Sequence, residues 1–465
     1  MSKFIKLIQN EHIKIFSKTS TWILIILMVT ISLGYNGFMR FGQYMREDAE
    51  RLNETADYIS GYQNTINYLK ETGEAENAAE IAAFEFMIKY EIGYQDWRNA
   101  EVVSLFHEKM EAEQESENNP ALKKIESRLN LLASNDWRSF FQEKLSAIDS
   151  DPSLSPQKKA AKGYYYRYVL AHDLDPIHPD WKSDLAKRVC ELKQTVVYLE
   201  QNAPSDPELK VELEKTKENL LLSEYRLTKN LKNYARQISY QNFSDIDLWS
   251  VLGLSNMLIT VISMVIIIIA SNSIANEFSS GTIKFLLINP IKRWKIFLSK
   301  YITILSVSLL TVLSFFLMNV FFGGIFFGFD NLFAPYLYVA ENTVQTLPGL
   351  FFILSEYLLG SVNLIVMGTL AFAISSLLRN ATVAIGLSLF AMLGGNTVVV
   401  FMKNVLNLDW ARFFIFANTD LNAVLSGSSI FQYMTVEFSL SVIAVHLLIF
   451  FLIAWDGFVR RKSIT

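Results

Sequence analysis

The stretch VLGLSNMLITVISMVIIIIASNSIA, from Val251 to Ala275, decides the fold of this chain. It carries no charged residue, and most of its side chains are Ile, Val, Leu or Met. A helix that crosses a bilayer needs about 20 mostly apolar residues, because the hydrocarbon core is about 30 Å thick. The stretch therefore predicts a transmembrane helix.

Runs of the same kind occur on both sides of it. The first could be read as a signal peptide, but Tyr35, Asn36 and Arg40 stand where a cleavage site would need small residues. A retained helix is therefore expected there, which gives six transmembrane helices in all. The five further predicted helices are Thr21–Phe38, Ile302–Phe327, Tyr357–Leu377, Ala381–Phe401 and Phe438–Trp455.

The composition of the whole chain agrees with a membrane protein. The 465 residues are 51% hydrophobic with a mean hydropathy of +0.23, more apolar surface than a soluble protein of this size can hide. A net charge of −4 excludes a strongly basic nucleic-acid binder, so no nucleic-acid partner is expected. The single cysteine, Cys190, excludes an internal disulfide and metal sites built from cysteine pairs.

Charged residues gather between the first and second hydrophobic runs, in residues 39–250. This region is rich in Glu, Lys, Ala, Leu and Gln, which favour helices, and its prolines fall between candidate helices. Leucines near heptad spacing from Leu209 to Leu227 indicate a long helix that packs on a partner helix, in the same domain or in a second copy. The fold class is thus an all-α membrane protein with six transmembrane helices and a large helical extracytoplasmic domain between the first and second.

The basic residues near the helix ends predict the orientation. Under a six-helix topology they all fall on one side, which the positive-inside rule assigns to the cytoplasm. Both termini are then cytoplasmic, residues 39–250 lie outside, and the chain is expected in a bacterial cell membrane. The basic residues are Lys3, Lys6, Lys14, Lys18, Lys284, Lys292, Arg293, Lys295, Lys300, Arg379, Arg460, Arg461 and Lys462.

Two groups in the outer region could bind a ligand. The tyrosines from Tyr164 to Tyr168 could form a ligand platform, although such groups are more often packing residues. His172, His178 and the aspartates around them could hold a metal ion, but their spacing matches no recognised ligand pattern. We therefore predict no metal site.

The N-terminal segment, residues 1–20, precedes the predicted helix at 21–38. In FIKLIQNEHIKIFSK, Phe4, Leu7, Ile8 and Ile15 can share one helical face between flanking lysines. Such a helix can lie in the membrane interface and contact lipid, whereas the alternative is a short solvated leader. We predict an amphipathic interfacial helix.

The link after the second predicted helix, residues 276–300 within the membrane part 251–465, is the most informative. SNSIANEFSSGTIKFLLINPIKRWKIFLSK, from Ser271 to Lys300, places a glutamate, a Gly-Thr pair, a leucine-rich turn, a proline and a basic run in succession. It is too polar to cross a bilayer. A short cytoplasmic helix, a bend and an amphipathic return are predicted, a shape on which a soluble partner can dock.

This link resembles the corresponding segment of ABC-2-type transporter permeases. The family pattern is matched over about thirty residues, with Asn289 and Lys292 as departures. The predicted six helices, the amphipathic N-terminus and an outer segment at 404–432 that looks like the family's short re-entrant helices extend the likeness. The docking residues that the resemblance implies are Glu277, Gly281, Thr282, Leu286, Pro290 and Arg293.

The resemblance implies a permease subunit of an ABC transporter. Such a subunit would export an amphiphile, peptide, lipid-linked molecule or ion, together with a second permease copy or homologue. A separate ATPase would bind ATP and Mg, and the sequence holds no G-x-x-x-x-G-K-[ST] phosphate loop. No enzymatic activity and no cofactor are expected on this chain. For Glu277, a helix cap or an ion-pair partner stays open as an alternative to docking.

Polar residues within the predicted helices are further candidates, because they are costly in a bilayer and often functional. His446 could bond a neighbouring helix, Asn363 and Asn396 could join helices, and Glu356 is expected to face water or headgroups. None suggests a catalytic set. The alternative function is a membrane-anchored sensor or receptor subunit whose outer domain binds a ligand or partner.

Overall fold

The computed structural model describes residues 2–55, 58–72, 77–94, 96–116, 119–202, 206–235, 246–281, 291–431 and 434–460. The chain forms two compact units. The membrane unit comprises Met1–Gln43, Ala235–Tyr336 and Leu347–Thr465, and the outer unit comprises Tyr44–Tyr234 and Leu337–Thr346.

Six helical stretches of the described chain are long and apolar enough to cross a membrane, which confirms the prediction from hydropathy. The second stretch, Leu248–Ser279, is α11 joined to α12 by a 3₁₀ turn at Asn256–Leu258. The last helix continues into a π-helical turn at Asp456–Arg460. The helices are α2 (Thr19–Thr55), α11 (Leu248–Ser255), α12 (Ile259–Ser279), α14 (Arg293–Phe327), α15 (Gly349–Leu378), α16 (Ala381–Asn404) and α18 (Val436–Trp455).

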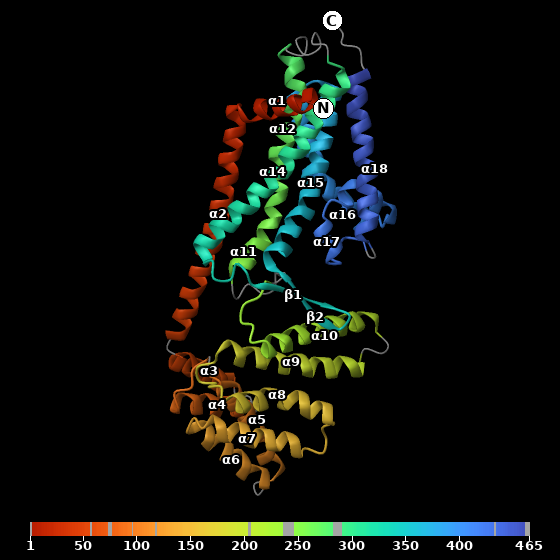
Figure 1. The fold of residues 1–465 in the computed structure, drawn as a ribbon. Coiled ribbons are helices and arrows are strands. Elements are labelled where there is room, and N and C mark those ends of the chain that lie inside the picture. The colour runs from red at the N-terminus through yellow and green to blue at the C-terminus, as the bar shows by residue number, and fades with distance from the viewer. Residues whose placement is uncertain are drawn as a thin grey trace. The chain divides into compact units, whose positions relative to one another are not determined.

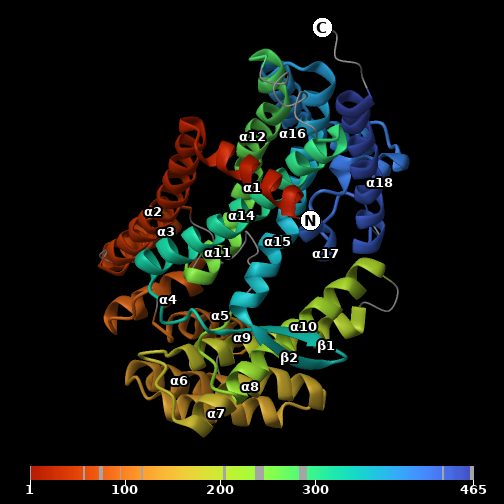
Figure 2. The same ribbon diagram turned by 45° about the horizontal axis from the view of Figure 1, so that its top comes forward.

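Helices α12, α14 and α15 pack side by side and form the centre of the membrane unit (Figures 1 and 2). Close approach of α12 to α15 depends on small residues, as in most membrane helix pairs. A Cβ at Gly368 would lie 2.9 Å from Cγ2 of Ile266. The hydroxyl of Ser375 donates to the carbonyl of Ser271 (2.6 Å) and accepts from the amide of Ala275 (3.1 Å).

The predicted N-terminal amphipathic helix is present as α1 (Ser2–Phe16), which packs on α14. The chain then turns at Ser17 and Lys18, and the hydroxyl of Thr21 donates to the carbonyl of Ile15 (2.6 Å) across that turn. The helix is therefore tied both to the start of α2 and to α14.

Two of the connections between membrane helices are mostly not α-helical. Strands β1 (Pro335–Ala340) and β2 (Thr343–Pro348) form a hairpin that the sequence analysis did not predict. Its turn residues Glu341 and Asn342 both have positive φ, the backbone shape of tight hairpins. Between α16 and α18, the chain forms 3₁₀ turns at Asp409–Phe413 and Ile415–Ala417 and the short helix α17 (Leu421–Leu425).

The described part of the outer unit is helical, as predicted, apart from the hairpin residues. Three helices begin with a proline, where the missing N–H leaves no backbone acceptor unsatisfied. The preceding residues Asn119, Ser155 and Asp206 cap them by accepting backbone N–H groups. The helices are α3 (Tyr58–Thr72), α4 (Ala78–Lys89), α5 (Asn99–Glu115), α6 (Pro120–Ala133), α7 (Trp137–Ser150), α8 (Pro156–His172), α9 (Trp181–Asn202) and α10 (Pro207–Thr228).

The outer unit also answers two questions left open by the sequence. The leucine-bearing helix α10 packs on α9, so its partner lies in the same unit. Tyr165 and Tyr166 pack edge-on against Phe141, and the hydroxyl of Tyr166 donates to Glu101 (2.9 Å). These two tyrosines are therefore packing residues, and burial raises the pKa of Tyr166 above its ordinary value.

His172 and His178, which were considered as metal ligands, contact residues near them in the sequence. Nδ1 of His172 lies 2.9 Å from the carbonyl of Tyr168 in its own helix, and Nδ1 of His178 lies 3.1 Å from Asp175. Across the described residues, no group of three or more His, Cys, Asp or Glu side chains is placed to hold a metal ion.

Candidate functional site

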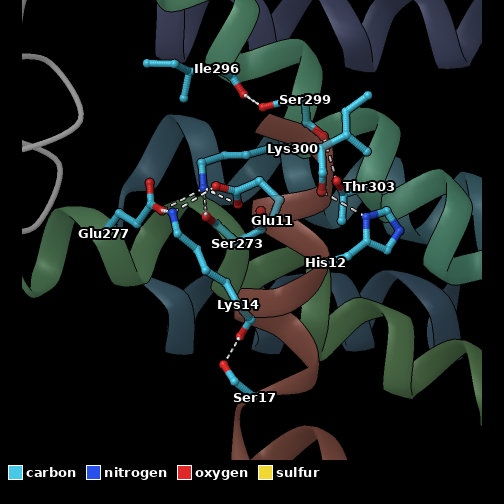
Figure 3. Close-up of polar contacts among 11 residues, drawn as sticks. Glu11, His12, Lys14, Ser17, Ser273, Glu277, Ile296, Ser299, Lys300 and Thr303 are labelled. Carbon is cyan, nitrogen blue, oxygen red and sulfur yellow. Dashed lines mark hydrogen bonds and ion pairs between the residues drawn. The ribbon is translucent and has the colours of Figure 1, made fainter. Parts of the chain in front are cut away.

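A buried lysine joins three segments of the membrane unit. Lys300, in the second turn of α14, is only 1% exposed. Its Nζ donates to Oε2 of Glu11 in α1 (2.8 Å), to Oε1 of Glu277 in α12 (2.7 Å) and to the carbonyl of Ser273 (3.2 Å) (Figure 3). All three N–H donors of the ammonium group can thus be satisfied.

Lys14 completes a set of two acids and two bases, which we call the charge cluster (Glu11, Lys14, Glu277 and Lys300). Nζ of Lys14 lies 2.9 Å from Glu11 and 3.3 Å from Glu277. Removing such charges from water is costly, and good geometry with opposite charges is needed to offset that cost. The charge cluster has two positive and two negative groups, and each ammonium group contacts both carboxylates.

The helices present these side chains for clear local reasons. Glu11 falls on the same face of α1 as Leu7, Ile8 and Ile15, so an α1 that lays its apolar face on α14 must bury Glu11 as well. His12 beside it also faces α14, where its Nε2 lies 2.8 Å from the hydroxyl of Ser306.

Glu277 lies in the last turn of α12, where the partial negative charge of the helix end disfavours a carboxylate. Lys300 offsets this by contacting both Glu277 and the Ser273 carbonyl one turn earlier. A third basic residue contacts this end of α12, because the guanidinium carbon of Arg379 lies 4.4 Å from the centre of the Phe278 ring. The end of α12 is therefore held by α1, α14 and the α15–α16 turn.

Glu11 and Lys14, the two cluster residues on α1, are both charged at neutral pH. Burial acts to raise the pKa of Glu11, but Lys300 and Lys14 outweigh it and hold the pKa below its ordinary value. Burial likewise acts to lower the pKa of Lys14, but Glu11 and Glu277 hold it above its ordinary value. The ion pair between Glu11 and Lys14 is therefore present in the neutral range.

A cavity of about 730 Å³ adjoins the cluster between α1, the start of α2 and α12. Its wall includes all four cluster residues together with the hydroxyls of Ser17 and Thr21 and the amides of Asn272 and Asn276. Lys14, with 39% of its side chain exposed, is the most accessible cluster member.

The residues expected at the docking bend fall into two groups. Glu277 belongs to the charge cluster, Gly281 follows α12 with a φ of +72°, and Arg293 begins α14. Thr282, Leu286 and Pro290 lie outside the described residues. Of the roles open for Glu277, the ion pair is present in the structure, whereas docking stays a prediction.

The intramembrane candidates are separate from the cluster. Nδ1 of His446 lies 2.9 Å from the carbonyl of Val442 in its own helix α18, not on the neighbouring helix that we expected. Glu356 is buried, with 9% exposed, so the prediction that it faces water is wrong. Asn363 lines a different cavity, described below.

The sequence analysis missed Glu11 and the roles of Lys14 and Lys300 as its partners. A signal was present, because a carboxylate in the middle of an apolar helical face requires a partner. It also missed a buried set on α2 and α14, in which Ser32 and Asn36 both donate to Oδ1 of Asn319 (3.1 Å each). Each of these three residues is 0% exposed.

These features define a multi-pass membrane protein whose helices are joined by buried polar contacts. The chain belongs to the family described as "Protein of unknown function (DUF2705)", which matches residues 222–463. This range contains Glu277 and Lys300 and excludes Glu11 and Lys14.

Two relatives from Bacillus subtilis (strain 168) support the assignment. "Uncharacterized protein YhcI" is 33% identical over 285 residues, which cover 60% of this chain and 84% of that relative. "Uncharacterized membrane protein YdbK" is 36% identical over 196 residues, which cover 42% of this chain and 75% of that relative. The second name agrees with a membrane location.

Proposed function

We propose that this chain is the permease subunit of an ABC transporter, which exports an amphiphile, peptide, lipid-linked molecule or ion. The observation that carries the proposal is the charge cluster at the end of α12. It ties α1 and α14 to the segment whose sequence resembles the ATPase-docking link of ABC-2-type permeases. A partner seated on residues 276–300 would therefore act on three membrane segments together.

The proposed mechanism is transmission of force. ATP-driven closure of two ATPase subunits would press on the bend between α12 and α14, in this chain and in a second permease copy. Because Lys300 bonds to both Glu277 and Glu11, movement of the α12 end would carry α14 and α1 with it. Alternating access would follow from rocking of these helices against the rest of the bundle.

The partner subunit would supply the nucleotide chemistry. ATP and Mg would bind to the ATPase, since this sequence has no phosphate loop to cradle them. The residues of this chain would transmit movement and line the pathway, without a step of bond making or breaking.

Purification from the native membrane tests the division of labour. A tagged chain should co-purify with a polypeptide that contains a phosphate loop, and ATP hydrolysis should follow that polypeptide. The chain alone should hydrolyse no more ATP than a mock preparation. Hydrolysis by the rigorously pure single chain, or recovery of the intact chain without any such polypeptide, would refute the proposal.

The proposed orientation has its own test. Cysteines introduced at Glu71 and Ser116 should react with an impermeant thiol reagent in intact cells, after Cys190 is replaced by Ser. A cysteine at Ser279, beside the charge cluster, should react only after the membrane is opened. Labelling at Ser279 and not at Glu71 in intact cells would reverse the topology.

A further inference from the structure

A polar cavity of about 500 Å³ lies beside the turn that joins α11 to α12, away from the charge cluster. Asn256 on its wall precedes Glu277 by 21 residues in sequence, which is roughly 30 Å along a helix. The other walls come from α15, α16 and the segment around α17. Four amide side chains line it, one from each of these elements: Asn256, Asn363, Asn396 and Asn422.

Three of these amides differ from Asn36 and Asn319, the buried amide pair between α2 and α14. Within the described residues, the side chains of Asn256, Asn363 and Asn396 form no hydrogen bond, whereas Asn36 and Asn319 bond to each other. Asn363 and Asn396, which were expected to join helices, therefore form no side-chain hydrogen bond between helices in the described part of the chain. Polar groups of membrane helices that face a cavity often mark ligand pathways.

Two glycines shape the walls. A Cβ at Gly360 would lie 2.8 Å from Oδ1 of Asn256, and a Cβ at Gly395 would lie 2.4 Å from the ring of Phe416. The missing side chains therefore leave room for a polar group on one wall and an aromatic ring on another. Met367 and Met392 add flexible apolar surface to the cavity.

The charge of the lining selects among ligands. Asp420 is the one acidic residue, its carboxylate accepts the backbone N–H of Ala423 (3.0 Å), and the described lining contains no Lys, Arg or His. An anionic head group would find no cation there. Asparagine amides offer both donors and acceptors, which suit a head group that presents both.

We propose that this cavity binds an amphiphile with an uncharged, hydrogen-bonding head group, held by the amides, and an apolar portion held by Phe416 and the methionines. The proposed binding of an amphiphile is argued from the cavity alone. The idea that this cavity is the export site rests on the proposed transport function.

Thiol protection tests the site in the full-length chain. The chain carries Cys190→Ser and Asn363→Cys, sits in phosphatidylcholine nanodiscs, and is treated with a water-soluble methanethiosulfonate. The neutral probe is dodecyl maltoside and the anionic probe is dodecyl sulfate. Both carry the same dodecyl chain and differ only in the head group. Dodecyl maltoside should slow modification several-fold and dodecyl sulfate should not. A matched His446→Cys chain, on α18 away from the cavity, should show no such difference.

A second substitution separates binding from a general effect on the bundle. Adding Asn256→Leu should weaken protection by dodecyl maltoside about fivefold, the effect of one lost hydrogen bond. Asn396→Cys, at an exposed position, reports on the same cavity if Asn363→Cys does not fold. Equal protection by both probes, or none by dodecyl maltoside, would overturn the proposal. The assay needs neither ATP nor a partner, so failure of transport would leave its result intact.

Discussion

Two polar sites along the α11–α12 stretch, the charge cluster and the cavity at Asn256, differ in whether their side chains pair with one another. At one end, Glu277 belongs to a neutral set of four charged groups joined by contacts of 2.7–3.3 Å. At the turn between α11 and α12, Asn256 faces a cavity and shares no side-chain hydrogen bond with the described residues around it. Paired polar groups fix how helices sit on one another, and unpaired ones leave bonding capacity for a ligand. The charge cluster therefore suits the proposed transmission of force, and the cavity suits the proposed ligand.

The largest expected effect is the loss of the central cation. Lys300→Met leaves Glu11 and Glu277 buried with only Lys14 between them. Removing one partner of a buried pair costs about 3–5 kcal/mol, so the detergent-solubilised chain should unfold at a much lower temperature. Lys292→Met, eight residues away and exposed, is the matched control and should unfold like the parent chain.

A triple variant sharpens this result. Glu11→Gln and Glu277→Gln added to Lys300→Met should recover much of the lost stability, because replacing a whole buried ion set is often neutral. A triple variant as unstable as Lys300→Met would show that Lys300 acts by packing alone.

A smaller effect is expected from Glu277→Ala. Lys300 keeps Glu11 and the Ser273 carbonyl, and no carboxylate of the cluster is left without a cation. The variant loses the contacts of Glu277 to Lys300 and to Lys14, and the shorter one to Lys300 accounts for most of the cost, about 1.5–3 kcal/mol. Thermal unfolding should place it between the parent and Lys300→Met. A midpoint at or below that of Lys300→Met would contradict the order of contacts in the cluster.

Acid should weaken the same end of the bundle. The pKa of Glu11 is lowered from 4.5 in the folded chain, so the folded state holds this proton less tightly than the unfolded state does. Its contribution to stability is full above pH 4.5 and is lost as the pH falls through the lowered pKa. The unfolding temperature of the parent should therefore approach that of Glu11→Gln below pH 4.5, and a constant difference would contradict this.

The smallest effect on stability is expected at the cavity. Asn363→Leu removes a half-buried amide that no described side chain or backbone group pairs, so no hydrogen bond within the protein is lost. The unfolding temperature should stay the same or rise slightly. A fall as large as that of Glu277→Ala would mean that the amide is a structural contact and would erase the difference between the two sites.

Length and polarity made the membrane helices predictable, because the bilayer imposes both on the sequence directly. The hairpin at Pro335–Pro348 was not predicted, since its turn uses Glu341 and Asn342 and lacks the usual glycine. The helical outer region and its proline starts were predicted because capping and propensity are local properties.

The two sites could not be found in the same way. Glu11 and Lys300 are 289 residues apart in sequence, and only the packing of α1 on α14 brings them together. Asn363 was singled out as an intramembrane amide, but its cavity depends on four elements from different parts of the chain. Neighbouring residues report local structure, whereas a site depends on which helices become neighbours.

The most direct test of the account concerns the bend after α12. Gly281 and Gly427 both have positive φ, +72° and +69°, and both have open space where a Cβ would lie. Valine at either position imposes similar backbone strain, but only Gly281 lies beside the charge cluster. ATPase bound per tagged chain should be measured at matched membrane levels. We expect Gly281→Val to lose most of the bound ATPase and Gly427→Val to keep it. Full binding and hydrolysis in Gly281→Val would contradict the proposal that this bend seats the ATPase.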